Sequence, residues 1–317
     1  MHLFNGLSQE IPNAEEKGMT RYFHGAGERG PYFEGWYFKF QGKNGDALAL
    51  IPAFHIDPAG RRSASLQVLT RDGSWWLDYP EADFHARADR LSIRMGESVF
   101  TRQGVQLRVE REGLSLHGTV TFGPFRELKS DIMGPFRFLP KMECSHGVIS
   151  MAHALEGQIV QNGRVLDLSG GTGYVETDRG RSFPDRYLWT QCVWQEPPCG
   201  SLMLSAATIP TPVGSFRGCI CAVLYRGREY RLATYRGAKI QRWDENGAVI
   251  CQGRCRLEVQ RMGERGQPLR APVGGAMART VHESLCGRVR YRFWTGGKLL
   301  FERTDSAASF ETSAHET

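Results

Sequence analysis

The chain has 317 residues, of which 41% are hydrophobic and 23% are charged, a composition typical of a globular protein large enough to bury a sizeable core. Its net charge of +6 is spread along the chain without a basic run interleaved with aromatic residues, which excludes a nucleic-acid-binding strip. Residues 1–18 lack the basic start and apolar core of a signal peptide, and no stretch approaches the ~20 apolar residues of a transmembrane helix, so we expect a cytoplasmic protein.

Residues 1–30 form a polar, turn-rich lead that ends in His24-Gly-Ala-Gly-Glu-Arg-Gly30. The glycines of this segment have the spacing of a dinucleotide-binding loop. Such a loop needs a strand before it and a helix after it, whereas here Pro31 opens a strand-like segment and no strand precedes the glycines. We therefore interpret the segment as a flexible loop and expect no nucleotide cofactor.

The chain continues as short strand-like segments separated by Gly, Pro, Asn and Asp. Residues 105–109 alternate apolar and polar side chains, and no long stretch follows the period of a helix. Dipeptides typical of hairpin turns occur at Asn44-Gly45, Asp72-Gly73 and Asn162-Gly163. The sequence therefore predicts an all-β fold. Its clearest strands in the first half are Tyr32–Phe40, Leu48–Ile56, Ser65–Thr70, Trp75–Tyr79, Val105–Glu110 and Leu114–Phe122.

Several short segments of the first half recur in the same order in the second half. The difference in residue number between matched residues, the offset, drifts slowly, which is typical of an internal duplication. The offset rises from 153 to 155 and then falls to 130–135 along the pairs Trp36–Trp189, Leu48–Leu202, Gln67–Ala222, Leu77–Leu232, Leu155–Leu285, Gly163–Gly297 and Glu176–Glu311. The fall indicates about 25 extra residues in the first half, near 123–147.

Strands of period two can hide one face only by packing against a second sheet or by closing into a barrel, and a closed barrel also removes the exposed sheet edges. We therefore predict two barrel-like halves, residues 1–180 and 181–317, with the inserted loop near 123–147 in the first half. A polar, Arg-rich link near Thr177–Arg186 connects them.

The eight Cys include two groups, Cys219-Ile-Cys221 and Cys251-x-x-x-Cys255, that offer four thiolates for zinc. Their spacing departs from the usual paired CxxC ligands, and in a chain without a secretion signal free thiols are the default. His85 and His117 lie in strand-like stretches without a ligand partner at metal spacing. We therefore expect free thiols and no bound metal.

Three segments combine aromatic with ionisable residues, namely 31–39, 142–151 and 173–192. In the first, strand alternation places Glu34, Trp36 and Phe38 on one face and Tyr37 and Lys39 on the other.

In the third segment, Tyr174, Glu176 and Asp178 share one face of a strand, and Trp189 and Gln191 share a face of the next. Two interpretations are open for these clusters. They either line a pocket with aromatic walls and a few convergent polar groups, or fill a core whose charges form ion pairs between the halves.

The same segments resemble the motifs of the tocopherol cyclase family. The shared runs are PYFEGWYFK at 31–39, DIMGPF at 131–136, MECSHGVISM at 142–151, LEGQ at 155–158, GYVETDRGRSFP at 173–184 and LWTQC at 188–192, with TIP and APVGG later, so that the resemblance spans about residues 31–311. Arg179 and Val193 stand where Trp and Asn are expected in the plant enzymes, and no plastid transit segment precedes the motifs, so we expect a bacterial or cytosolic relative. The resemblance implies a lipocalin-like, two-barrel fold and closure of a prenylated hydroquinone into a chromanol ring.

This reaction is an isomerisation and needs no redox cofactor, nucleotide or metal. An acid protonates an alkene, aromatic faces stabilise the cation, and the phenol oxygen closes the ring. We therefore expect a cyclase that acts on a prenylated quinol or a similar hydrophobic polyene. A non-catalytic carrier or sensor of hydrophobic small molecules is the alternative, and a related acid-type enzyme such as a hydratase is a third. Peripheral contact with membrane lipids and the oligomeric state are left open.

The expected acid is Glu176, with Glu34 and Asp178 as alternative carboxyl groups and His146 as an orienting partner. The expected ligand-binding residues are Trp36, Tyr37, Tyr174, Trp189 and Gln191. We expect Trp36, His146, Trp189 and Gln191 to approach one cavity between the halves or at their mouth. The competing interpretation is that Glu176 is ionised and paired with Arg179 or Arg181.

Overall fold

The computed structural model describes residues 22–138, 142–211, 214–264 and 266–313. Residues 1–18, which we judged to lack a signal peptide, lie outside the described residues. Within the described ranges no helix is long and apolar enough to cross a membrane. The helical elements there are the short 3-10 turns η1 (Gly25–Gly27), η2 (Glu81–Asp83), η3 (Gly134–Phe138) and η4 (Thr234–Arg236), and all other regular elements are strands, which confirms the all-β prediction.

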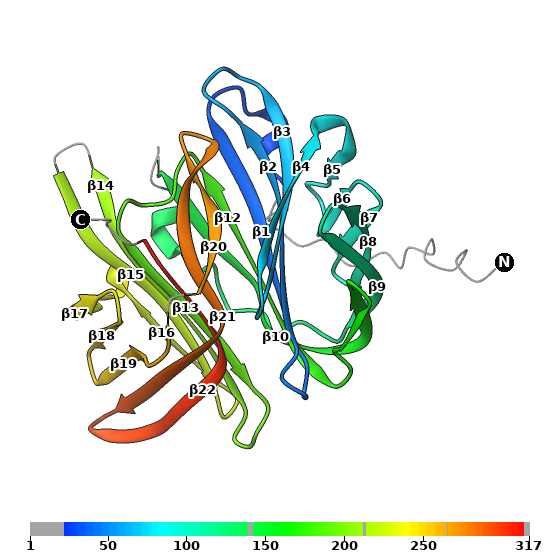
Figure 1. Cartoon of the computed structure of the whole chain (residues 1–317). Helices are drawn as coiled ribbons and strands as arrows, with labels where there is room; N and C mark the ends of the chain where they lie inside the picture. Colours follow the sequence, from blue (N-terminus) through cyan, green and yellow to red (C-terminus); the bar gives the residue numbers. More distant parts are fainter. Residues whose placement is uncertain (1–21, 139–141, 212–213, 265, 314–317) are drawn as a thin grey trace.

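The first half forms one antiparallel sheet of 12 strands, in the order β4-β3-β2-β1-β12-β10-β9-β8-β7-β6-β5, with β11 beside β10. Its edge strands β4 and β5 are consecutive in the chain and are joined by η2, so the sheet curls round on itself (Figure 1). The strands are β1 (Tyr32–Gln41), β2 (Ala47–Ile56), β3 (Arg62–Thr70), β4 (Ser74–Pro80), β5 (Phe84–Ala86), β6 (Ser92–Met95), β7 (Ser98–Thr101), β8 (Gly104–Arg111), β9 (Leu114–Phe122), β10 (Cys144–Gln161), β11 (Arg164–Asp167) and β12 (Gly171–Gly180).

The second half forms an antiparallel sheet of 10 strands with the same plan, in the order β16-β15-β14-β13-β22-β21-β19-β18-β17, with β20 beside β21. Its edge strands β16 and β17 are again consecutive and are joined by η4. The strands are β13 (Tyr187–Trp194), β14 (Gly200–Thr211), β15 (Gly214–Tyr225), β16 (Arg228–Ala233), β17 (Lys239–Asp244), β18 (Gly247–Gln252), β19 (Cys255–Arg261), β20 (Gln267–Val273), β21 (Ala276–Thr295) and β22 (Lys298–Thr312). In both sheets the first strand pairs with the last, as an internal duplication predicts.

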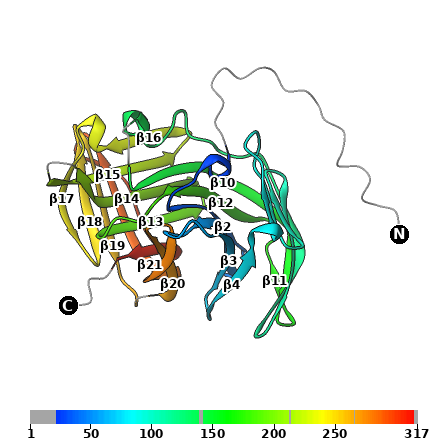
Figure 2. The same ribbon diagram turned by 90° about the horizontal axis from the view of Figure 1, so that it is seen from above.

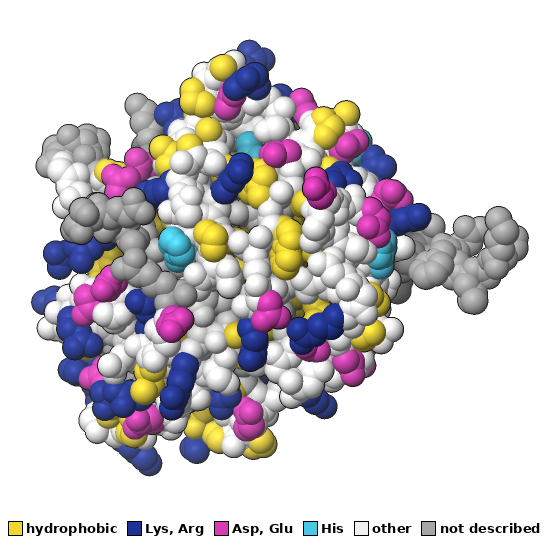
Figure 3. All heavy atoms as spheres, viewed as in Figure 1, with side chains coloured by type: hydrophobic (Ala, Val, Ile, Leu, Met, Phe, Trp, Pro, Cys, Tyr) yellow, Lys and Arg dark blue, Asp and Glu magenta, His cyan; other side chains and the backbone are white. Residues whose placement is uncertain are grey.

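The chain passes from the first sheet to the second between Gly180 and Tyr187, close to the boundary that we placed at residue 180. The two sheets lie side by side, and β10 and β12 of the first lie next to β13 and β14 of the second (Figure 2). On the face drawn in Figure 3, acidic and basic side chains are interspersed and hydrophobic ones form separate small patches.

Strand register corrects one detail of the predicted repeat. Tyr37 lies opposite Glu176 on β12, and Trp189 lies opposite Glu311 on β22. Since Glu176 and Glu311 are equivalent, Tyr37 and not Trp36 is the counterpart of Trp189. The alignment that paired the two tryptophans is one residue out of register, and a slip of one residue in a strand moves a side chain to the opposite face of the sheet.

The described residues form three buried apolar clusters. One lies inside the curl of the first sheet and contains Trp36, and a second lies inside the curl of the second sheet and contains Tyr291. The third lies between the sheets and contains Tyr37, Tyr174 and Trp189. The alternation predicted for β1 is therefore confirmed: its even-numbered side chains enter the first core, and its odd-numbered ones face the second half.

The extra residues between β9 and β10 reach across to the second half. Arg231 on β16 donates hydrogen bonds to the backbone oxygens of Ser130 and Asp131, at 3.0 and 2.9 Å, and the Tyr235 hydroxyl donates to the backbone oxygen of Ile132 at 2.9 Å. These contacts hold one side of the junction between the sheets.

On another side of the junction, the Gln67 side-chain amide binds the backbone N–H and C=O of Arg270, at 2.7 and 3.0 Å, and so fastens β20 to the first sheet. The space between the sheets is thus bounded by the inserted residues and by the β20–β21 hairpin.

Candidate active site

A cavity lies between the two sheets, outside both curled cores. The volume that the centre of a water molecule can occupy in it is about 170 Å³. This is more than ten times the ~10–15 Å³ that a single water needs by the same measure, so the cavity has room for an organic ligand. Its wall is mostly apolar and aromatic, and it is formed by β1, β2, β3, β10 and β12, by the inserted residues, and by strands of the second sheet. The ionisable residues in this wall are His55, Cys144, His146, Glu176, Asp178, Tyr37, Tyr187, Cys219, Arg270, Glu283 and Glu311.

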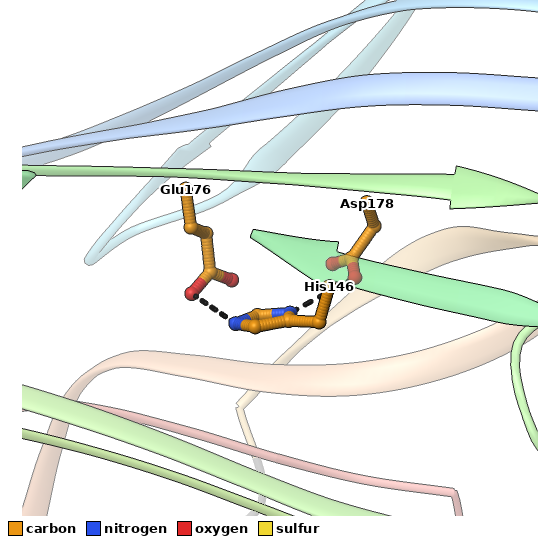
Figure 4. A group of neighbouring side chains, drawn as sticks. All are labelled: His146, Glu176 and Asp178. Atoms are coloured by element: carbon orange, nitrogen blue, oxygen red, sulfur yellow. Dashed lines mark hydrogen bonds and ion pairs between the residues drawn. The ribbon is translucent and has the colours of Figure 1, made fainter. Parts of the chain in front are cut away.

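Glu176 lies in the wall on β12 and is almost completely buried. Its Oε2 atom accepts a hydrogen bond from the hydroxyl group of Tyr174 and another, of 3.2 Å, from Nε1 of Trp189. Nε2 of His146 lies 3.3 Å from the same oxygen, at ion-pair distance (Figure 4). Arg179 lies on the opposite face of β12, because the faces of a strand alternate. Among the described residues the charged partner of Glu176 is therefore His146, and not Arg179 or Arg181 of the competing interpretation.

His146 is held between two carboxyl groups. It lies opposite Asp178 in the pairing of β10 with β12, and its Nδ1 atom is 2.9 Å from Oδ1 of Asp178 (Figure 4). Burial disfavours the imidazolium form, but the charges of Asp178 and Glu176 outweigh it and raise the pKa of His146 well above its usual value. Burial also raises the pKa of Glu176, although the facing imidazolium opposes that rise. Glu176 is thus suited to hold a proton at the cavity wall.

The same three residues could bind a metal ion, since their ligand atoms lie within 4.8 Å of one another. The observed geometry does not favour this. Each ring nitrogen of His146 faces a different carboxylate, so an ion touching all three residues would require the ring to turn out of the Asp178 hydrogen bond. The arrangement fits an imidazolium between two carboxyl groups better, and the absence of a metal from the reaction stays a prediction.

The second sheet contributes two more buried carboxyl groups that sequence reasoning did not select. Glu283 on β21 and Glu311 on β22 lie directly opposite each other, and both line the cavity. The Tyr37 hydroxyl donates to Glu283, and the Tyr187 hydroxyl donates to Glu311. Burial raises the pKa of Glu283 to about 7, and burial together with the charge of Glu283 raises that of Glu311 to about 8. The repeat contained a signal for Glu311, because it aligned this residue with Glu176.

Of the residues expected around one cavity, the wall contains His146 and Trp189 but neither Trp36 nor Gln191. Trp36 is in the first core, where it packs against Phe23 and Phe84. Gln191 lies further along β13 and accepts a 3.3 Å hydrogen bond from the buried Lys39.

Glu34 and Tyr174 are also outside the cavity wall. Glu34 lies on the core face of β1 and accepts hydrogen bonds from the backbone N–H groups of His24 and Gly25, at 2.8 and 3.1 Å, and from the Tyr32 hydroxyl at 2.9 Å. These bonds fasten the lead-in segment to the sheet and hold Glu34 on the face of β1 opposite to the cavity. Tyr174 acts on the cavity through its hydrogen bond to Glu176.

Comparison with known proteins gives a family and a fold. A family model described as tocopherol cyclase-like matches residues 111–314, which is 204 of the 317 residues. A putative AttH from Nitrosomonas europaea is similar in structure with a TM-score of 0.52 and 12% identity, covering 90% of this chain and 92% of that chain. Kievitone hydratase from Nectria haematococca has a TM-score of 0.53 and 10% identity, and the match covers 90% of this chain and 89% of that chain. CghA with Sch210972 has a TM-score of 0.56 and 10% identity, and the match covers 90% of each chain. At these identities the three structures show a shared fold, and fold alone does not assign an activity.

Proposed function

This chain belongs to the tocopherol cyclase-like family, and on that premise we propose that it is an acid-catalysed cyclase acting on a prenylated quinol or a similar hydrophobic polyene that carries a hydroxyl group. The observation that carries the proposal is the position of Glu176. It is a buried carboxyl group in the wall of a largely apolar cavity, with a raised pKa and with His146 and Asp178 behind it.

In the proposed step the Glu176 O–H bond breaks, and its proton forms a C–H bond with the less substituted carbon of a trisubstituted alkene. The other alkene carbon becomes a tertiary cation, and a hydroxyl oxygen of the same substrate forms a C–O bond to it. The hydroxyl proton then leaves to a carboxylate, so substrate and product are isomers. The ring centres of Tyr37 and Trp189 lie 5.2 Å apart in the junction. Both residues line the cavity, so their aromatic faces can stabilise the cation.

The surroundings of Glu176 favour the state that it reaches after giving up its proton. The Tyr174 hydroxyl and the Trp189 N–H already point at Oε2, and the His146 imidazolium lies 3.3 Å from it. These donors bind a carboxylate more strongly than a neutral carboxyl group, so they stabilise the transition state more than the ground state. Fixed donors of this kind need no rearrangement when the charge develops.

One alternative uses the same cation. A structural relative is named a hydratase, and water capturing the cation would give a tertiary alcohol in place of a ring. A carrier or sensor would need the cavity but no placed acid. The apolar wall favours ring closure over capture by water.

The test is to incubate the protein with a prenylated hydroquinone in D₂O and to analyse the products by mass spectrometry. Closure predicts a cyclic isomer with one deuterium on carbon, because the transferred proton comes from an exchangeable carboxyl group. A product heavier by one water would indicate a hydratase. Recovery of unchanged, undeuterated substrate from a panel of prenylated quinols, with binding shown separately, would contradict the cyclase and support a carrier.

A further inference from the structure

The cavity wall formed by the second sheet has an acidic centre of its own. Glu283 and Glu311 are 1% and 8% exposed, occupy directly paired positions on β21 and β22, and therefore project from the same face as neighbours. Two like charges at such positions repel each other, and burial strengthens the repulsion. A single proton shared between the two carboxyl groups removes this repulsion.

This pair faces the first acid across the junction, as the hydrogen bonds show. Tyr37, which is paired in register with Glu176, reaches across to donate to Glu283. Trp189, which is paired in register with Glu311, reaches across to donate to Glu176. The aromatic side chain of each half thus binds the carboxyl group of the other, and both acidic centres line the same cavity.

The charged groups around the pair do not neutralise it. From β1, Lys39 favours ionised Glu283, but its Nζ atom already donates to the backbone oxygen of Ala307 at 2.6 Å and to Gln191. From β12, Asp178 adds negative charge, as does Glu176 once it has lost its proton, and from β13 Tyr187 donates one hydrogen bond to Glu311. The wall as a whole therefore retains protons near neutral pH, with Glu283 and Glu311 titrating at about 7 and about 8.

We propose that Glu283 and Glu311 share a proton and form the second proton-transfer centre of this cavity, which accepts the proton that the substrate hydroxyl group loses on ring closure. This inference rests on the proposed cyclase function and assigns the receiving carboxylate. As the C–O bond forms, the hydroxyl O–H bond breaks and its proton bonds to the free carboxylate oxygen of the pair. After product leaves, the pair holds one proton more and Glu176 one fewer, and transfer through water in the emptied cavity restores both.

The alternative is that Glu176 performs both steps, and the variants Glu283→Gln and Glu311→Gln distinguish the two. If the pair accepts the proton, each variant still protonates the alkene in D₂O. Its cation then reverts by proton loss to open-chain alkenes that carry deuterium, and closure falls at least ~tenfold. Glu176→Gln should give neither closure nor deuterated alkene. Normal closure in both pair variants would overturn the assignment. Glu302→Gln, an exposed carboxyl on β22, is the matched control.

The shared proton is tested without any turnover by infrared titration of the protonated-carboxyl band. The wild type should lose this band in two separated steps between about pH 6 and 9, because a coupled pair titrates as a unit. Each single variant should show one step that lies between the two, and the double variant should show neither of these steps and keep only the band of Glu176. A wild-type curve equal to the sum of the single-variant curves would refute the shared proton, whatever the activity. A wild type that shows both steps but closes no ring would refute the cyclase and, with it, the acceptor role.

Discussion

Replacing Glu176 by Gln keeps the shape of the side chain and removes its transferable proton. The amide oxygen of the variant can accept the same two hydrogen bonds, from Tyr174 and Trp189, that Oε2 of Glu176 accepts. His146 loses its ion pair with Glu176 but keeps Asp178 at 2.9 Å. Since a hydrogen bond contributes ~1 kcal/mol net and none is left unpaired here, the free energy of unfolding should change by less than ~2 kcal/mol.

The effect on turnover should be much larger than the effect on stability. Loss of a general acid lowers a rate by ~10²–10⁴, which corresponds to ~2.7–5.5 kcal/mol in the barrier. Initial rates at saturating substrate, ligand affinity from quenching of tryptophan fluorescence, and urea unfolding should therefore separate the two effects, with Glu302→Gln as the control. Turnover within threefold of wild type, in a variant that folds and binds, would exclude Glu176 as the acid and direct the search to Glu283 and Glu311.

Four further predictions follow from the same geometry. Asp178→Asn removes a charge that raises the pKa of His146, so the alkaline limb of the pH profile of kcat/KM should move to lower pH; an unmoved limb would contradict a role for the imidazolium. Trp189→Phe keeps an aromatic face but removes the N–H donor to Glu176, so turnover should fall ~5–10-fold, as expected for one hydrogen bond. Trp36→Phe, in the first core, should lower the unfolding temperature and leave KM unchanged. Finally, the folded-state pKa values of Glu283 and Glu311 lie above the ordinary 4.5, so between these values the folded protein keeps protons that the unfolded chain has lost; the free energy of unfolding should fall from about pH 5 to about pH 8 and level off above it, less steeply in the Glu283→Gln/Glu311→Gln variant, as measured by urea titration.

Strand alternation accounts for what the sequence could predict of the site. It grouped Tyr174, Glu176 and Asp178 because β12 is regular, and the all-β order followed from the turn residues between short apolar runs. Alternation alone could not place His146 against them, because that contact depends on the register of β10 with β12, although His146 was among the expected site residues as the orienting partner. The alignment of Trp36 with Trp189 was misleading for a related reason. An error of one residue leaves the order of the strands correct, but it assigns a side chain of the core face to the cavity face.

Glu283 illustrates a second limit. It lies within the 20-residue strand β21, where every second side chain from Val281 to Phe293 is buried and the neighbouring residues carry no aromatic cluster like those of β1 and β13. Only its pairing with Glu311, and the reach of Tyr37 across the junction, show that it faces the cavity.

The duplicated fold explains how one cavity can hold two different acidic centres. Equivalent positions on the two last strands carry Glu176 and Glu311, so the halves start from the same carboxyl group. β10 places Val148 directly opposite Glu176 and His146 two residues away, opposite Asp178 of β12, whereas β21 places Glu283 directly opposite Glu311. An imidazolium favours loss of the proton from its carboxyl neighbour, and a second carboxylate favours retention of one. Two identical walls would have the same proton affinity and no preferred direction of transfer. In the proposed mechanism, this difference between the two neighbouring strands makes one wall the better donor and the other the better acceptor, which is what an isomerisation that both adds and removes a proton requires.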